Sequence, residues 1–106
     1  MAVTRVVNIH LETYDVFIGR GSPFGNPYSH KEGTKAVFVV RDQASAVSAY
    51  ARWLTTDFEI ADWQKPSREQ ILELHGKRLG CYCVAGEPCH GHVLVMLADE
   101  MALGLR

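Results

Sequence analysis

Cysteine and histidine residues gather in one short segment near the C-terminal end of the sequence. The segment holds all three cysteines of the chain, Cys81, Cys83 and Cys89, together with His90 and His92. Thiolates and imidazoles bind transition metals, and a thiolate is also a strong nucleophile. The segment is therefore interpreted as a metal site, as a reactive pocket or as a buried turn rich in sulfur.

The spacing of these residues brings their side chains together. Side chains alternate along a strand, so Cys81 and Cys83 point to the same side of the strand predicted over residues 79–84. Thiols that run parallel in this way are poorly oriented for a mutual disulfide, but they can converge on a third group. The short loop over residues 84–88 is able to return Cys89 and His90 to the same strand end.

A zinc ion is the first interpretation of the cluster. Three thiolates and one imidazole form a tetrahedral zinc shell, and the ligands here would be Cys81, Cys83, Cys89 and His90. The pattern differs from the usual one, in which at least two residues separate the cysteines of a pair and a second pair lies elsewhere in the chain.

A reactive thiol and a buried thiol are the alternatives. The free N–H groups at the start of a helix favour a thiolate, so Cys89 could act as a nucleophile with His90 or His92 as general base. Free cysteine also packs as a small apolar side chain, and Cys81 is the best candidate for that role. The role of His92 stays open between ligation, support of a ligand and a place on the surface.

A loop rich in glycine and proline is the second segment of interest. It runs from Gly19 to Pro27 with the sequence GRGSPFGNP. Its glycines permit close approach of the backbone to a ligand, and an arginine fork suits a phosphate or a carboxylate. The loop matches neither a P-loop nor the dinucleotide-binding fingerprint. We expect ligand contacts from Arg20, Gly21, Ser22, Gly25 and Asn26. The alternative is a rigid turn in which Arg20 pairs with Asp15.

The elements that position these segments can be read from hydrophobic periodicity and turn residues. Strands are predicted over residues 3–11, 15–18, 36–40 and 79–84. Helices are predicted over residues 42–56, with Asp42 as N-cap, over residues 67–76, with a capping box at Ser67, and after Pro88. Residues 57–65 look irregular. The pattern predicts a single α/β domain over residues 1–106, with a short mixed sheet of about four strands flanked by about three helices. A mixed sheet is expected because the first two strands are joined too tightly for a crossover helix.

The composition and net charge of the chain argue against several classes of function. The chain has 106 residues and a formal net charge of −1, so nothing in its charge favours nonspecific binding to nucleic acid or to an anionic membrane. No apolar stretch reaches the length of a membrane span, and the first residues lack the apolar core of a signal peptide. The expected location is the cytoplasm, where cysteines remain thiols or metal ligands.

Two motifs carry a resemblance to a known family. The segments DVFIGRGSPFGNPY and GKRLGCYCVAGEPCHGHVL resemble a small domain family of unknown function from bacteriophages and bacteria. Its members share an IGRGSPxGNP loop and an ending of the form LGC[WY]C…PCHGxVL, and the resemblance spans Val6 to about Leu97. An aspartate often follows PCHG in the family, whereas this chain has His92. The resemblance implies that the members share a site, but it implies no particular reaction. If the chain is phage-encoded, its expected location is the host cytoplasm. The shared positions fall on Gly19, Arg20, Gly21, Gly25, Asn26, Pro27, Cys81, Cys83, Cys89, His90 and Gly91.

The two segments meet if the strand after Asp15 and the strand before Cys83 are parallel neighbours. Their carboxyl ends would then place Arg20 and Asn26 beside Cys83 and the start of the last helix. Such a pocket suits a nucleotide-like or phosphorylated small molecule, and an enzyme of nucleotide or nucleic-acid-related metabolism is one hypothesis, with Cys89 and His90 as catalytic residues. The alternative is a noncatalytic phage or bacterial interaction module, stapled by zinc or merely rich in sulfur, that binds a host protein.

Overall fold

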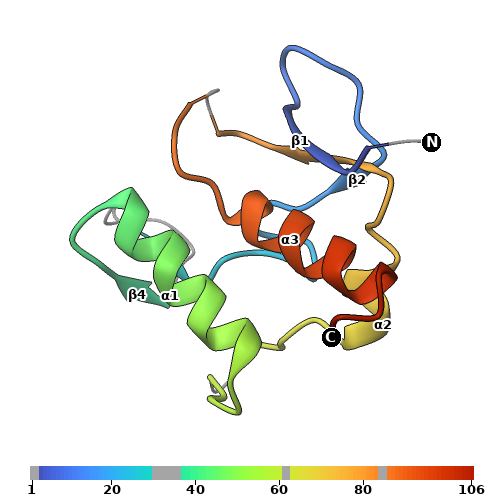
Figure 1. Cartoon of the computed structure of the whole chain (residues 1–106). Coiled ribbons are helices and arrows are strands. Elements are labelled where there is room, and N and C mark those ends of the chain that lie inside the picture. The colour runs from blue at the N-terminus through green and yellow to red at the C-terminus, as the bar shows by residue number, and fades with distance from the viewer. Residues whose placement is uncertain (1–2, 30–36, 61–62, 84–85) are drawn as a thin grey trace.

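The computed structural model describes residues 3–29, 37–60, 63–83 and 86–106 (Figure 1). In this part of the chain, five short strands and three helices follow one another. Their bounds are β1 Arg5–Asn8, β2 Val16–Phe17, β3 Tyr28–Ser29, β4 Phe38–Val39, α1 Gln43–Thr55, α2 Arg68–Leu72, β5 Arg78–Cys81 and α3 His90–Ala102.

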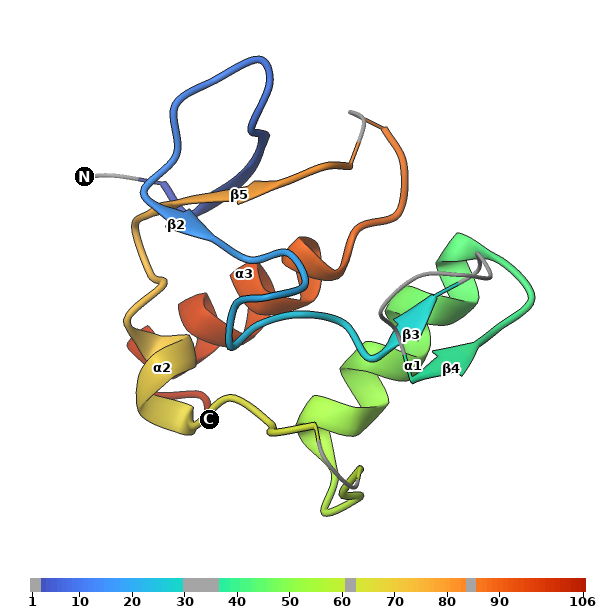
Figure 2. The same ribbon diagram turned by 180° about the vertical axis from the view of Figure 1, so that it is seen from behind.

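The main sheet has three strands in the order β1-β5-β2, and β5 pairs in parallel with both of its neighbours. Figure 2 shows β2 and β5 side by side, with the chain leaving both strands toward the same side of the molecule. The segment between β1 and β2 returns across the outer face of the sheet. A side chain at Gly80 would place its Cβ 2.6 Å from Cγ of Tyr14 and 2.9 Å from Cγ2 of Ile9. Glycine at this position therefore allows the return segment to lie against the sheet.

Helix α3 covers the opposite face of the sheet (Figure 1). A Cβ at Gly91 would lie 2.7 Å from side-chain atoms of both Ile18 and Val6, so the first turn of the helix packs closely on β1 and on the end of β2. The core between the helices and the sheet contains large, fully buried side chains, among them Trp53, Tyr50, Ile18, Leu74, Leu79, Leu94 and Leu97.

Local capping fixes the starts of α1 and α2 as the sequence predicts. The Asp42 carboxylate accepts a hydrogen bond from the backbone N–H of Ser45. Ser67 and Gln70 form a capping box, in which each side chain accepts from the backbone N–H of the other residue. Helix α2 is nevertheless shorter than the predicted segment 67–76. It ends at Leu72, and a turn follows in which Gly76 has a φ of 79°.

The predicted α/β class and the three helices are confirmed. Among the described residues, the strands form two sheets rather than one, since β3 and β4 pair only with each other, and the pairs within both sheets are parallel rather than mixed. The prediction of a mixed sheet assumed that β1 and β2 pair directly, whereas β5 lies between them. The predicted strand 3–11 ends at Asn8, and Ala36 of the predicted strand 36–40 lies outside the described residues.

In the described part of the chain, no helix combines the length and the apolar character that a membrane span requires.

An ion pair fastens the start of β2 to β5. The Arg78 guanidinium donates to both carboxylate oxygens of Asp15, at 3.2 and 3.0 Å, and the Arg78 backbone N–H donates to the same group at 2.8 Å. These hydrogen bonds lower the pKa of Asp15 from 3.8 to about 2. The carboxylate therefore stabilises the fold above about pH 4.

Replacing Asp15 by Asn should remove this contribution. The free energy of unfolding of the variant should be lower than that of the wild type at neutral pH. The difference should shrink as the pH falls from about 4 through about 2, because the wild-type carboxylate is then protonated. Urea unfolding between pH 2 and pH 7 measures it, with exposed Asp57→Asn as the control. A difference that does not change with pH would contradict the assignment.

Candidate functional site

The three cysteine sulfurs converge at the end of β5. Cys81 is the last residue of β5, Cys83 follows it, and Cys89 is the N-cap of α3. Their Sγ atoms all lie within 4.8 Å of one another, and those of Cys81 and Cys89 are 3.3 Å apart. Backbone N–H groups of Cys83 and Gly91 donate to the sulfurs of Cys81 and Cys89, each at 3.4 Å. The predicted convergence of the thiols is present in the structure.

This sulfur group fits a metal ion. Zinc binds thiolates at about 2.3 Å, so two sulfurs of a tetrahedral shell lie about 3.8 Å apart. The separations in the cluster come close to that spacing, and all three cysteines are free of disulfides. Backbone N–H donors on two of the sulfurs also suit thiolates. Three side chains that could hold a metal ion are thus in place.

His90 lies outside the sulfur group, although the sequence predicts it as the fourth ligand. Its Nε2–H donates to the backbone oxygen of Ile18 at 2.7 Å, because a carbonyl oxygen can only accept. Its ring also packs edge-on against Tyr50, with centroids 5.1 Å apart. Burial lowers the pKa of His90, which favours the neutral ring. The predicted ligand set Cys81, Cys83, Cys89 and His90 is therefore not assembled.

The thiols share their ionisation. Hydrogen bonds from Cys83 and Cys89 hold the pKa of Cys81 far below its ordinary value, while hydrogen bonds to Cys81 and Cys83 raise that of Cys89. Of the three thiols, Cys81 is therefore the one that ionises most readily. Both thiols are almost completely buried. A raised pKa and burial make Cys89 a weak nucleophile in the metal-free form, so the catalytic role of Cys89 and His90 stays a prediction.

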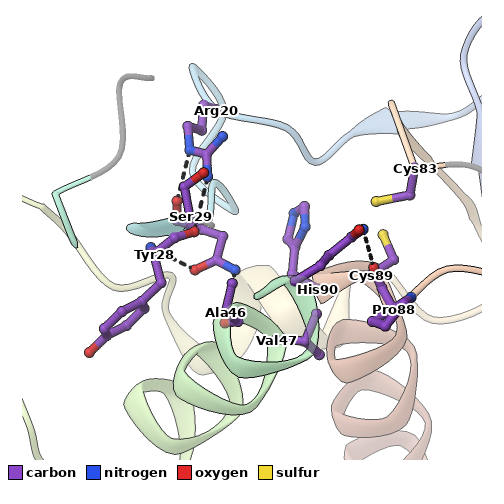
Figure 3. Close-up of a pocket in the computed structure, with 11 residues that line it drawn as sticks. Arg20, Tyr28, Ser29, Ala46, Val47, Cys83, Pro88, Cys89 and His90 are labelled. Atoms are coloured by element: carbon purple, nitrogen blue, oxygen red, sulfur yellow. Dashed lines mark hydrogen bonds between the residues drawn. The ribbon is translucent and has the colours of Figure 1, made fainter. Parts of the chain in front are cut away.

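A cavity of about 130 Å³ opens beside the sulfur group (Figure 3). It lies between the glycine-rich loop and the first turns of α1 and α3. Figure 3 shows the thiols of Cys83 and Cys89 close together at one end and the guanidinium of Arg20 at the other. The predicted meeting of the two sequence segments is present. The cavity is lined by Arg20, Asn26, Tyr28, Ser29, Gln43, Ala46, Val47, Cys83, Pro88, Cys89 and His90.

Arg20 is held in place by backbone oxygens. Its Nε donates to the oxygen of Asn26 and its Nη2 to that of Tyr28, both at 3.0 Å. The predicted alternative, a pair between Arg20 and Asp15, is wrong because Asp15 pairs with Arg78. Within the described ranges, Arg20 has no acidic partner. Partial burial lowers its pKa, as expected for a cation removed from water without a counter-charge.

The other predicted ligand residues of the loop have different positions. Asn26 lines the cavity, but its amide donates to the Ala46 oxygen and its side-chain oxygen accepts from the Tyr28 N–H. The Ser22 hydroxyl donates to the Gly19 oxygen at 2.6 Å. Gly21 adopts a φ of 99°, and the Gly25 oxygen accepts from the Trp63 indole at 3.2 Å. Gly21, Ser22 and Gly25 therefore shape the loop and do not line the cavity.

Sequence reasoning missed Gln43. It is the first residue of α1, it lines the cavity, and its amide donates to the Pro88 oxygen at 2.6 Å. This bond joins the start of α1 to the loop before α3. The signal was present in the position of Gln43 directly after the predicted N-cap Asp42, where side chains surround the free N–H groups of a helix.

The profile of a domain of unknown function, DUF4326, matches residues 2–100. The chain belongs to this family. An uncharacterised 12.4 kDa protein of Enterobacteria phage T4, from the nrdA–td intergenic region, is 27% identical over 97 residues. That alignment covers 92% of this chain and 79% of the phage protein. No solved structure gives a significant match. The expected family of small phage and bacterial domains is confirmed, and membership assigns no reaction to the site.

The position of the loop against α1 depends on Tyr50. The Tyr50 hydroxyl is buried and donates to the Phe24 oxygen at 2.7 Å. Replacing Tyr50 by Phe should lower the free energy of unfolding by about 1–3 kcal/mol, because it leaves this carbonyl unpaired. Urea unfolding measures the loss, with Tyr82→Phe as the control, since Tyr82 is 63% exposed. Equal stability of both variants would show that the bond contributes nothing.

Proposed function

We propose that this DUF4326 domain binds a small anionic molecule, nucleotide-like or phosphorylated, in the cavity beside Arg20. We further propose that Cys81, Cys83 and Cys89 hold a zinc ion in the wall of that cavity. One observation supports both parts. Arg20, which has no acidic partner among the described residues, lines the same cavity as two of the three converging thiols.

The charge of the cavity favours an anion. Arg20 supplies a guanidinium, and the first turns of α1 and α3 both line the cavity, where free backbone N–H groups and the helix dipole add positive potential. The size of the cavity limits what can enter. At about 130 Å³ it is smaller than the 300–1,000 Å³ of typical pockets for drug-sized ligands. A phosphate group fits this space, and the remainder of a nucleotide would lie at its open mouth.

The chemistry of the cysteines favours zinc. Thiolates are soft ligands that select zinc among the common divalent ions, and the three sulfurs already lie close to the spacing of a tetrahedral shell. When bound, the ion would join the end of β5 to the start of α3 and neutralise thiolate charge. It would thereby fix Cys83 and Cys89, which face the proposed ligand.

An exposed group of aromatic side chains favours a second function. Tyr82 contacts the rings of Phe17 and His10, with centroids 5.8 and 5.7 Å apart, and Tyr14 contacts Phe17 at 6.4 Å. Tyr82 and Tyr14 are 63% and 44% exposed. Aromatic side chains are enriched at protein interfaces, so this face suits a noncatalytic interaction module that binds a host protein. Failure of the zinc-loaded protein to bind any phosphate-bearing molecule would favour this second function.

Removing the guanidinium of Arg20 tests the anion site. Calorimetric titration with inorganic phosphate and with nucleoside monophosphates should detect binding to the wild type. The Arg20→Gln variant should bind about 10-fold or more weakly, because a hydrogen bond to a charged group is worth about 1.5–3 kcal/mol. Arg52→Gln, an exposed substitution on α1, is the matched control.

Thermal melts of the same variants separate a loss of binding from a loss of folding. Equal affinity of the wild type and Arg20→Gln, with both proteins folded, would exclude Arg20 from the site. Absence of binding to the wild type would overturn the proposed ligand class.

Native mass spectrometry tests the zinc ion. The wild type should carry an excess mass of one zinc under native conditions, and denaturation should release it. Cys83→Ser should lose the ion, because a serine hydroxyl is a poor zinc ligand. Tyr82→Phe, between two of the cysteines, should retain it. Chelation should lower the melting temperature of the wild type and leave that of Cys83→Ser unchanged. A wild type without excess mass that also takes up no added zinc would contradict the metal site.

A further inference from the structure

A second cavity lies against the sulfur group, and it is distinct from the one that contains Arg20. It has a volume of about 260 Å³ and is bordered by the end of β1, the loop before α3 and the first turn of α3. Cys83 and Cys89 line both cavities, so the sulfurs form a wall between them. His92 and Glu87 line only the second. Glu12 also lines the second cavity, but its carboxylate accepts a hydrogen bond from the Arg5 guanidinium at 2.9 Å. Among the described residues that line this cavity, His92 and Glu87 are therefore the ionisable metal ligands that can approach Cys83 and Cys89 most freely.

The geometry of the helix start favours His92. Cys89 is the N-cap of α3, which makes His90 the first and His92 the third residue of the helix. Side chains at the N-cap and at the third helical position lie close together, as in a capping box, where each reaches the backbone of the other. His92, like His90, lies outside the sulfur group in the structure, but a change of its rotamer can bring its ring over the sulfur of Cys89. His90 points away from it, toward the Ile18 oxygen.

Moving the side chain of His90 to the sulfurs would also cost more than moving that of His92. His90 would have to give up the 2.7 Å hydrogen bond to Ile18 and its packing against Tyr50. His92 is exposed, and among the described residues its ring takes part in no recorded hydrogen bond or ion pair. A change of rotamer at an exposed position costs little. His92 can thus join the three sulfurs without disturbing the core.

We propose that His92, and not His90, is the fourth ligand of the metal, which it would reach through the second cavity. The proposal rests on the zinc site put forward above. It makes the ion four-coordinate, with three sulfurs and one nitrogen, and such closed shells are characteristic of structural zinc. The ion would then support the wall of the Arg20 cavity and would offer no open position to a ligand there.

Cobalt substitution tests this ligand set without any assay of activity. Co²⁺ replaces zinc and reports its ligands through sulfur-to-metal charge-transfer bands and through the d–d bands of a tetrahedral ion. The wild type should give the spectrum of three sulfurs and one nitrogen. His92→Ala should shift the d–d bands and weaken zinc binding by about 10-fold or more in a chelator competition, since even supporting groups of metal sites contribute that much.

Three further variants make the result specific. His92→Cys should restore tight binding and increase the charge-transfer absorption, because a fourth thiolate replaces the imidazole. Glu87→Gln and His75→Ala should leave the spectrum and the affinity unchanged.

The possible failures are distinguishable. A wild type that binds neither cobalt nor zinc would overturn the metal site and this inference together. A metal-loaded His92→Ala protein with the wild-type spectrum and affinity would overturn only the role of His92. A changed spectrum in Glu87→Gln, with His92→Ala unaffected, would assign the fourth position to the carboxylate.

Discussion

Backbone hydrogen bonds hold β5 between β1 and β2, and each part of the candidate site takes its position from that arrangement. The strand at the centre delivers the cysteines, and its neighbour β2 delivers the loop with Arg20. Because the two strands are parallel, both carboxyl ends reach the same edge of the sheet, which is the usual place of binding sites in α/β domains. An antiparallel pairing would have put the arginine and the thiols at opposite ends.

Two glycines make this arrangement sterically possible. At Gly80 the return segment with Tyr14 crosses one face of β5, and at Gly91 the first turn of α3 meets the other face of the sheet. A Cβ would lie within 2.7 Å of a neighbouring side chain at either position. The second contact sets the depth of α3 and so the position of Cys89, its N-cap. The spacing between the sulfurs therefore depends on close packing around the sheet as well as on the loop between Cys83 and Cys89.

Much of the site could be predicted from local rules. Alternation along a strand predicts that Cys81 and Cys83 share a side, and a short loop predicts the return of Cys89. Contacts between residues that lie far apart in the sequence were harder to predict. The pair of Arg78 and Asp15 depends on the register of β2 against β5, which no local pattern reveals, and the sequence instead suggested the nearby Arg20 as the partner.

The sequence anticipated β2 and β5 as parallel neighbours, but the place of β5 between β1 and β2 was missed, since strands adjacent in sequence were assumed to pair. The choice of His90 was also a nonlocal problem. It sits next to Cys89 in the sequence, but two helical residues such as His90 and His92 point about 200° apart around the axis. Only the packing of α3 on Ile18 determines which of them faces the core.

A metal in the sulfur group and a ligand beside Arg20 would be coupled, because their proposed sites share a wall. Cys83 and Cys89 border the Arg20 cavity on one side and the second cavity on the other. Without metal, an ionised thiol in the sulfur group would oppose the approach of an anion to the Arg20 cavity. A zinc ion would neutralise that charge and fix the loop before α3, to which Gln43 also connects α1. Metal binding should therefore strengthen anion binding, and by thermodynamic reciprocity a bound anion should strengthen the retention of the metal by the same factor.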